Sequence, residues 1–124
     1  MSSASGECAQ TRDLDAQLRR IGVKVIPLVA LGNGIPDRLY VYGGLTLFVE
    51  YKADSNTLSP MQRQCIGQIA SQGGAVCVCR FTSAGLHKED IDGNMLISIN
   101  SWRAYSPREL WEWLASSVGR IPPC

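Results

Sequence analysis

The chain has 124 residues, of which 45% are hydrophobic, which suits one domain with its own core, and its apolar runs are too short to cross a bilayer. The first residues lack a basic segment followed by an apolar one, so we expect no secretory signal and a cytoplasmic location. The net charge of +1 is no strong signature of nucleic-acid binding, and it neither supports nor excludes a DNA partner.

Hydrophobic periodicity and turn residues predict an α/β fold, a mixed β-sheet flanked by helices. We expect a frayed segment over 1–6, a helix over 7–21, strands over 23–29, 37–42 and 45–52, a helix over 59–72, a strand over 75–80, a polar loop over 82–94, a short strand over 95–99 and a helix from 106 to about 118. The segment over 45–80 is a strand–helix–strand unit, which implies a parallel pair and a right-handed crossover. The predicted domain has an α-β-β-β-α-β core over 7–80, and the extension over 81–124, with its extra C-terminal helix, packs on that core.

Two helix starts carry capping boxes, Ser59 with Gln62 and Ser106 with Glu109. Pro27 in the first strand indicates an edge strand or a bulge, because proline cannot donate to a β-ladder.

The five cysteines are Cys8, Cys65, Cys77, Cys79 and Cys124. An odd number without a secretory signal argues against a disulfide framework. A zinc site takes about four ligands, and the chain has one histidine and no CxxC pair. Cys77 and Cys79 alternate in a predicted strand, so we favour buried free thiols on one face over structural zinc.

The predicted hairpin around Gly43-Gly44 brings two carboxylates together. A two-residue or symmetric four-residue loop places Asp37 directly opposite Glu50, with Cβ atoms about 4.5–5.5 Å apart. Lys52 lies on the same face as Glu50, two residues along the strand. Burying like charges is costly, and a hard divalent cation between the two carboxylates would remove the repulsion.

Lys52 would then lie where it can stabilise a phosphoryl oxygen or orient the attacking water. Gly32 and Gly34 in the preceding loop would let the backbone pass close to a ligand. The alternative is structural: Glu50 and Lys52 form a solvated ion pair at a strand end, and Asp37 is a turn residue after a proline.

Three ordered motifs resemble the virus-type replication-repair nuclease (VRR-NUC) domain, a compact branch of the PD-(D/E)xK nuclease superfamily. They are Gly34-Ile35-Pro36-Asp37, then Glu50-Tyr51-Lys52, then Leu58-Ser59-Pro60-Met61-Gln62, followed by a glycine-rich stop and a hydrophobic strand. The resemblance covers roughly residues 7–80 and implies a small restriction-endonuclease-like fold. The segment from 82 to 124 lies outside it.

The resemblance also implies roles for the motif residues. Asp37 and Glu50 would bind Mg²⁺ or Mn²⁺, with the backbone carbonyl of Tyr51 completing part of the shell. Lys52 would position or activate the attacking water. Gln62 would lie near the site at the start of the second helix, a role compatible with its place in the capping box.

Family members often carry a further metal-binding glutamate on the first helix. Glu7 is the best candidate because it lies on the same stripe as the core-facing leucines, and Asp13 and Asp15 are the alternatives.

Single-domain members resemble phage or prophage proteins that act as dimers, some of them on branched DNA. The resemblance therefore implies a metal-dependent DNA endonuclease, selective for branched or junction DNA, that acts as a homodimer in a bacterial host cell. Three tryptophans in the extension support either a dimer surface or, as we favour, the chain's own core: Trp102, Trp111 and Trp113.

Two other functions are open. One is a non-catalytic nucleic-acid-binding or inhibitory protein on a nuclease-like fold, against which the intact Asp37, Glu50 and Lys52 argue. The other is a nuclease that acts on RNA, which has the same phosphodiester chemistry.

Overall fold

The computed structural model describes residues 8–53 and 55–116. In chain order the elements are α1 (Ala9–Arg19), β1 (Lys24–Pro27), η1 (Val29–Leu31), β2 (Arg38–Tyr42), β3 (Leu45–Ala53), α2 (Pro60–Ser71), β4 (Ala75–Thr82), β5 (Gly85–Glu89), β6 (Met95–Ile99), η2 (Trp102–Ala104) and α3 (Pro107–Ala115). The strands form one sheet in the order β1-β2-β3-β4-β5-β6. All neighbours are antiparallel except β3 and β4, which are parallel. The mixed sheet confirms the predicted fold class, while residues 1–6, expected to fray, lie outside the described part of the chain.

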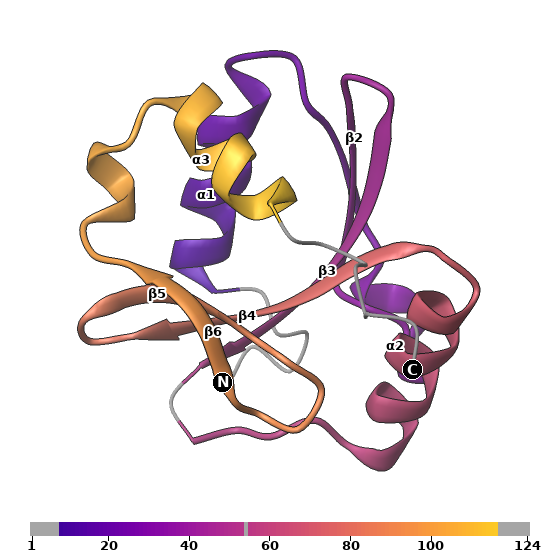
Figure 1. The fold of residues 1–124 in the computed structure, drawn as a ribbon. Coiled ribbons are helices and arrows are strands. Elements are labelled where there is room, and N and C mark those ends of the chain that lie inside the picture. Colours follow the sequence, from indigo (N-terminus) through magenta and orange to yellow (C-terminus); the bar gives the residue numbers. More distant parts are fainter. Residues whose placement is uncertain (1–7, 54, 117–124) are drawn as a thin grey trace.

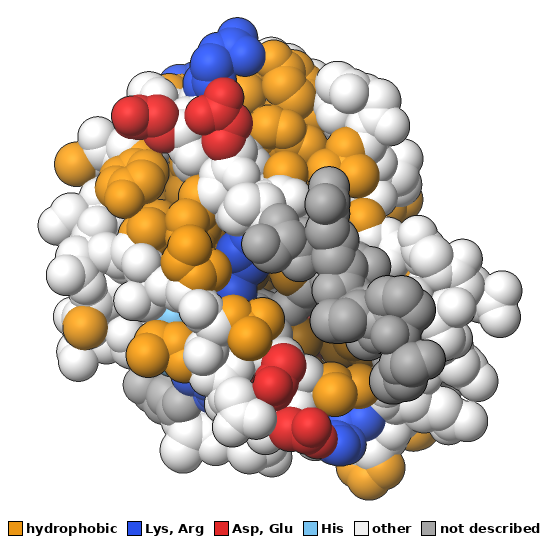
Figure 2. All heavy atoms as spheres, viewed as in Figure 1, with side chains coloured by type: hydrophobic (Ala, Val, Ile, Leu, Met, Phe, Trp, Pro, Cys, Tyr) orange, Lys and Arg blue, Asp and Glu red, His pale blue; other side chains and the backbone are white. Residues whose placement is uncertain are grey.

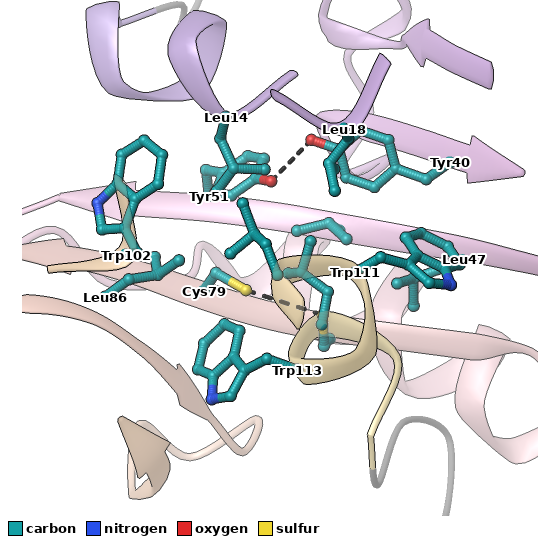
Figure 3. Close-up of a cluster of buried hydrophobic side chains, with 14 of the residues drawn as sticks. Leu14, Leu18, Tyr40, Leu47, Tyr51, Cys79, Leu86, Trp102, Trp111 and Trp113 are labelled. Carbon is teal, nitrogen blue, oxygen red and sulfur yellow. Dashed lines mark hydrogen bonds between the residues drawn. The ribbon is translucent and has the colours of Figure 1, made fainter. Parts of the chain in front are cut away.

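Helices cover both faces of the sheet: α1 and α3 lie together on one face, and α2 lies on the other (Figure 1). The larger hydrophobic core lies under α1 and α3, where Leu14 and Leu18 of α1 pack over the sheet (Figure 3). A smaller cluster under α2 consists of Ile66, Val76 and Val78. One end of the sheet, near the first turn of α2, lines the cavity described below.

The three tryptophans of the extension belong to the larger core (Figure 3). Trp102, Trp111 and Trp113 are 3%, 7% and 8% exposed. This confirms that they pack on the chain's own core. Cys77 and Cys79 are buried in the same core as free thiols, as predicted.

The β2–β3 hairpin has the predicted register, with Tyr42 opposite Leu45 and Arg38 opposite Val49. Gly43 and Gly44 have φ angles of 57° and 84°. Positive φ at both central residues is what a two-residue type I′ turn requires. The turn therefore sets the alternation of faces along both strands.

Both predicted capping boxes are present, at Ser59 with Gln62 and at Ser106 with Glu109. Pro27 lies in β1, at the edge of the sheet, where a missing N–H donor does not interrupt the ladder. The last helix, expected to reach about residue 118, ends at Ala115, and residues beyond 116 lie outside the described part.

The prediction of a polar loop over 82–94 was wrong, because residues Gly85–Glu89 form β5. Its Leu86 and Lys88 face the larger core, and Lys88 is only 3% exposed. The Lys88 ammonium donates hydrogen bonds to the carbonyls of Leu114 and Ser116, at 3.2 and 2.6 Å, at the C-terminal end of α3. The charge is thus satisfied by a distant element, which the local sequence pattern does not reveal.

None of the described helices is long and apolar enough to span a bilayer. The face seen in Figure 2 carries small groups of acidic and basic side chains among hydrophobic ones. Three consecutive apolar side chains of the edge strand β6 are exposed: Met95 (62%), Leu96 (62%) and Ile97 (44%).

Candidate active site

A cavity of about 430 Å³ lies where β2 begins and β3 ends, and the loop before β2 and the start of α2 form its walls. Five residues of the predicted site line it: Asp37, Glu50, Tyr51, Lys52 and Gln62. The structure therefore brings together every predicted site residue within the described part of the chain.

Asp37 lies directly before β2, one residue beyond the Arg38–Val49 pair of the hairpin. Its Oδ2 accepts a 3.1 Å hydrogen bond from the backbone N–H of Tyr51 on β3. This bond ties the side chain across the hairpin toward Glu50, as the predicted register requires.

Glu50 is 2% exposed, so its carboxylate is almost fully withdrawn from water. Its Oε2 accepts a 3.0 Å hydrogen bond from the Gln62 amide and lies 3.6 Å from Lys52 Nζ. Its Oε1 is buried and has no hydrogen-bond partner among the described residues. A buried oxygen without a partner is costly unless a ligand completes it.

Burial raises the pKa of Glu50 to about 8, and the neighbouring negative charge of Asp37 contributes to this rise, whereas Lys52 opposes it. The carboxyl group therefore holds its proton at neutral pH when no other cation is near. A divalent cation would replace that proton and hold the carboxylate in its charged form.

The donor set fits a hard divalent cation, which takes oxygen ligands. Asp37 and Glu50 supply two neighbouring carboxylates, and Glu50 Oε1 is the oxygen that needs a partner. In the described residues no cluster of three or more histidine, cysteine, aspartate or glutamate side chains is suited to a metal. Any further oxygen ligands within this part of the chain would be backbone carbonyls, side-chain amides or water.

Gln62 has two roles, and the structure shows both contacts. Its Oε1 accepts a hydrogen bond from Ser59 N at 2.9 Å, which closes the capping box of α2. Its Nε2 donates to Glu50. The helix cap and the position of the site carboxylate thus depend on the same side chain.

Gly34 explains how α2 comes so close to the hairpin. Its φ is +79°, and a Cβ at this position would lie 2.4 Å from the carbonyl oxygen of Met61. We expected Gly34 to admit a ligand, but its close approach is to the first turn of α2, next to Gln62. Gly32 also lines the cavity, and a Cβ at that position would meet no other atom within 4 Å.

The carboxylates considered on the first helix divide into two groups. Glu7 lies outside the described residues. Asp13 is exposed and pairs with Arg103 at 3.0 Å. Asp15 is buried and pairs with Arg38 at 2.9 Å on the opposite face of the sheet from Glu50. The alternatives Asp13 and Asp15 were therefore wrong, because both carboxylates are engaged away from the cavity.

Sequence reasoning missed the hydrogen-bond network around Asp15, which lies behind the cavity. Asp15 accepts a 2.6 Å hydrogen bond from the Tyr40 hydroxyl, which is 2.7 Å from the Tyr51 hydroxyl. Helical spacing gives a signal for it, since Thr11, Leu14, Asp15 and Leu18 are all buried on one stripe of α1. The network anchors Tyr51, whose N–H donates to Asp37.

A second missed feature is a polar row that continues from Lys52 onto β4 and β5. Lys52 is paired with Arg80, and Arg80 with His87. Glu89 binds both neighbours, with Oε1 at 3.2 Å from Arg80 Nη2 and Oε2 at 2.6 Å from His87 Nε2. The Arg80 guanidinium in this row is therefore paired with the Glu89 carboxylate.

Comparisons with known proteins identify a family and a similar fold. The family model of the VRR-NUC domain matches residues 9–82. Among solved structures, the chain is similar to Hjc, a Holliday junction resolvase from the archaeal hyperthermophile Archaeoglobus fulgidus, with 21% sequence identity and a TM-score of 0.50. The likeness covers 71% of this chain and 80% of that one. No curated protein sequence matches the chain.

Proposed function

The chain belongs to the VRR-NUC domain family, and from this premise we propose that it is a metal-dependent DNA endonuclease whose active site is the cavity around Asp37, Glu50 and Lys52. One observation carries the proposal. Glu50 is a buried carboxylate with one oxygen that lacks a hydrogen-bond partner in the described residues and with Asp37 close enough to raise its pKa. Such an arrangement is unfavourable in an inert protein and is favourable for holding a cation.

The ion we propose is Mg²⁺ or Mn²⁺, held by Asp37 and Glu50 with the backbone carbonyl of Tyr51 as a further oxygen ligand. When bound, the cation supplies Lewis-acid stabilisation of the phosphoryl oxygens. Glu7 remains part of the proposed ligand set on the family resemblance alone.

Lys52 has the position of a group that acts on the reacting atoms. Its side chain is 13% exposed and its ammonium lies 3.6 Å from Glu50 Oε2. From there it can donate a hydrogen bond to the attacking water or to a non-bridging phosphate oxygen, where negative charge develops. Gln62 would keep Glu50 in place by binding its Oε2.

The substrate we propose is DNA, either branched or duplex, with a preference for branched or junction forms. The support is the family resemblance together with the fold that the chain shares with a Holliday junction resolvase. We further propose that the protein acts in the cytoplasm of a bacterial host cell as a phage- or prophage-encoded enzyme, a setting that the resemblance suggests.

We also propose a homodimer, because a domain that carries the cavity described above would cut one strand at a time. The edge strand β6 offers a surface for a second copy. An edge strand can pair with its own copy about a two-fold axis, and the apolar side chains of Met95, Leu96 and Ile97 are exposed on β6.

The test of the proposed function is cleavage of labelled substrates by the purified protein. The substrates are linear duplex, flap and four-way DNA and a single-stranded RNA, each incubated with Mg²⁺, with Mn²⁺ or with EDTA. We expect cleavage of DNA with either metal, fastest on the branched forms, and none with EDTA.

The other outcomes separate the alternatives. Binding of DNA without cleavage under any metal would favour the non-catalytic protein. Cleavage confined to RNA would keep the chemistry and change the substrate. Cleavage that persists in EDTA would overturn the metal-dependent mechanism.

A further inference from the structure

A second hollow of about 280 Å³ adjoins the active-site cavity, and Phe81 lies in the walls of both. Three segments build it: the first turn of α1 at Gln10, the β4–β5 turn over 82–85 and the segment Ser101–Arg103. The Phe81 ring stacks on Tyr51 at 5.4 Å on one side and contacts Trp102 at 5.9 Å on the other. An aromatic row therefore connects the two hollows.

The hollow depends on the part of the chain outside the family match. The matched region ends at residue 82, and the turn and the segment Ser101–Arg103 follow it. Gly85 has a φ of +146°, and a Cβ there would lie 2.3 Å from the carbonyl oxygen of Ile99. This glycine allows the β4–β5 turn to press against the end of β6, so that the two segments enclose the hollow together.

Arg103 is the single charged residue among the described residues that line the hollow. Its guanidinium lies 4.4 Å from the ring centre of Trp102, which is itself buried. Stacking on a fixed ring limits the positions of the arginine side chain. Ser83 and Ser101 add exposed hydroxyl groups that can donate hydrogen bonds.

The ion pair between Arg103 and Asp13 is exposed to solvent, so another anion can replace the carboxylate. Nη2 and Oδ2 are 3.0 Å apart, and the two side chains are 56% and 57% exposed. Exposed pairs of this sort contribute little to stability. An incoming phosphate, whose oxygens match the planar guanidinium, can therefore replace the Asp13 carboxylate at small cost.

The pairing of β3 with β4 shows how the two hollows are placed along the strands. Lys52 is paired with Arg80 and Ala53 with Phe81, so the second hollow begins at Phe81 and Thr82, one to two residues further along β4. That is about 3–7 Å along the strand, at roughly 3.3 Å per residue. Lys52 and Phe81 point to opposite faces of the sheet, so a nucleic-acid backbone held at Lys52 would pass around the ends of β3 and β4 to reach this hollow.

We propose that the second hollow binds a backbone phosphate of the nucleic-acid strand that occupies the active site, with Arg103 as the cationic partner. The inference rests on the proposed function, since it places the strand at Lys52. It adds a phosphate subsite built by the C-terminal extension. Asp13 acts there as the counterion that the phosphate displaces.

The test measures the affinity of a fluorescein-labelled DNA duplex by anisotropy in EDTA, over a range of salt concentrations. The logarithm of the binding constant falls with the logarithm of the salt concentration, and losing one phosphate contact should make this slope shallower by about 0.9. We therefore expect Arg103→Ala to reduce the slope by that amount and to weaken binding about tenfold. Arg103→Lys should restore the slope, and Asp13→Asn should tighten binding.

The matched control is Arg20→Ala, an exposed arginine at the other end of α1, which should leave slope and affinity at the parental values. The inference is overturned if Arg103→Ala leaves the slope unchanged, whatever happens to the affinity. It is overturned equally if Arg20→Ala causes the same loss, because the effect would then be diffuse charge.

Cleavage separates this inference from the proposed function. With Mn²⁺, Arg103→Ala should raise KM and leave kcat nearly unchanged, as expected for a contact made equally in the ground and transition states. If the parent cuts nothing but Arg103→Ala still lowers the slope, the subsite stands and the nuclease proposal fails. If the parent cuts and Arg103→Ala binds with the parental slope, the nuclease proposal stands and the subsite fails.

Discussion

The side-chain amide of Gln62 donates a 3.0 Å hydrogen bond to Oε2 of Glu50. Oε1 of the same side chain accepts a hydrogen bond from the backbone N–H of Ser59, which completes the capping box of α2. A helix start and a buried carboxylate are therefore held by one residue. This coupling lets stability and activity be separated by two substitutions in the capping box, at Ser59 and at Gln62.

Ser59→Ala and Gln62→Ala should have different consequences. Ser59→Ala removes the cap and should lower the free energy of unfolding by about 1 kcal/mol, with cleavage unchanged. Gln62→Ala removes the cap bond and the bond to Glu50, and should also lower kcat about tenfold. Thermal melts and single-turnover rates check both. Equal rates in the two variants would show that Gln62 acts on the helix alone.

Lys52→Ala should abolish most cleavage and leave the fold intact. The expected loss in kcat is about 10²–10³-fold, the usual effect of removing one donor aimed at developing charge. DNA affinity and the melting temperature should change little. Lys24→Ala, on the exposed edge strand β1, is the control and should cut like the parent. A Lys52→Ala enzyme with parental kcat would leave Lys52 as a plain ion-pair partner of Glu50.

Metal binding should raise the stability of the parent. A ligand that binds only the native state stabilises it by about 2.7 kcal/mol at a hundredfold excess over Kd. Asp37→Asn removes the negative charge that disfavours ionised Glu50, while the amide oxygen can still accept a hydrogen bond from the Tyr51 N–H. In EDTA this variant should be at least as stable as the parent, and it should lose the response to Mn²⁺. The measurement is the melting temperature of each protein with EDTA and with Mn²⁺. If millimolar-range Mn²⁺ does not raise the melting temperature of the parent, the proposed metal site is contradicted.

The raised pKa of Glu50 makes the metal-free protein sensitive to pH. Its folded pKa is about 8, above the value of about 4.3 in an unfolded chain. Between these values the native state binds more protons, so the stability contributed by protonated Glu50 is lost as pH rises toward 8, by at most about 1.4 kcal/mol per pH unit.

Urea unfolding in EDTA across this pH range provides the measurement. Other groups titrate too, so the informative quantity is the difference between the parent and Glu50→Gln. The parent should lose stability relative to Glu50→Gln as the pH increases. If the free energies of unfolding of the parent and of Glu50→Gln change with pH in the same way, Glu50 is ionised in the folded protein.

The proposed dimer can be tested at β6. Leu96→Lys places a charge on the exposed edge, which is how natural proteins block edge pairing. Light scattering should then show a monomer where the parent is a dimer. Met61→Lys, at another exposed apolar side chain, is the control and should stay dimeric. A parent that is monomeric at assay concentrations contradicts the dimer directly.

The hairpin shows why much of this site could be predicted from the sequence. Gly43 and Gly44 determine the turn, the turn determines the register, and the register determines which side chains share a face. The position of Asp37 relative to Glu50 follows from this local chain of causes. The capping box at Ser59 is local in the same way.

The features that could not be predicted depend on distant partners. Lys88 looked like a loop residue because its acceptors lie at the end of α3, 26 and 28 positions further along the chain. Asp15 looked like a spare acid because Arg38 and Tyr40, which hold it, belong to another element. Neither pattern of partners is encoded within a few residues of the side chain concerned.

The buried ammonium of Lys88 also limits how the protein can be shortened. A chain that ended before α3 would lose the carbonyls of Leu114 and Ser116 that accept from the Lys88 ammonium, together with the helix that covers this part of the core. Four side chains of α3 belong to the larger core, Leu110, Trp111, Trp113 and Leu114, and exposing the apolar surface they cover would remove a large share of the stability of a small domain. We therefore expect a chain that stops before α3 to unfold more easily than the parent, which thermal melts of the two proteins would show.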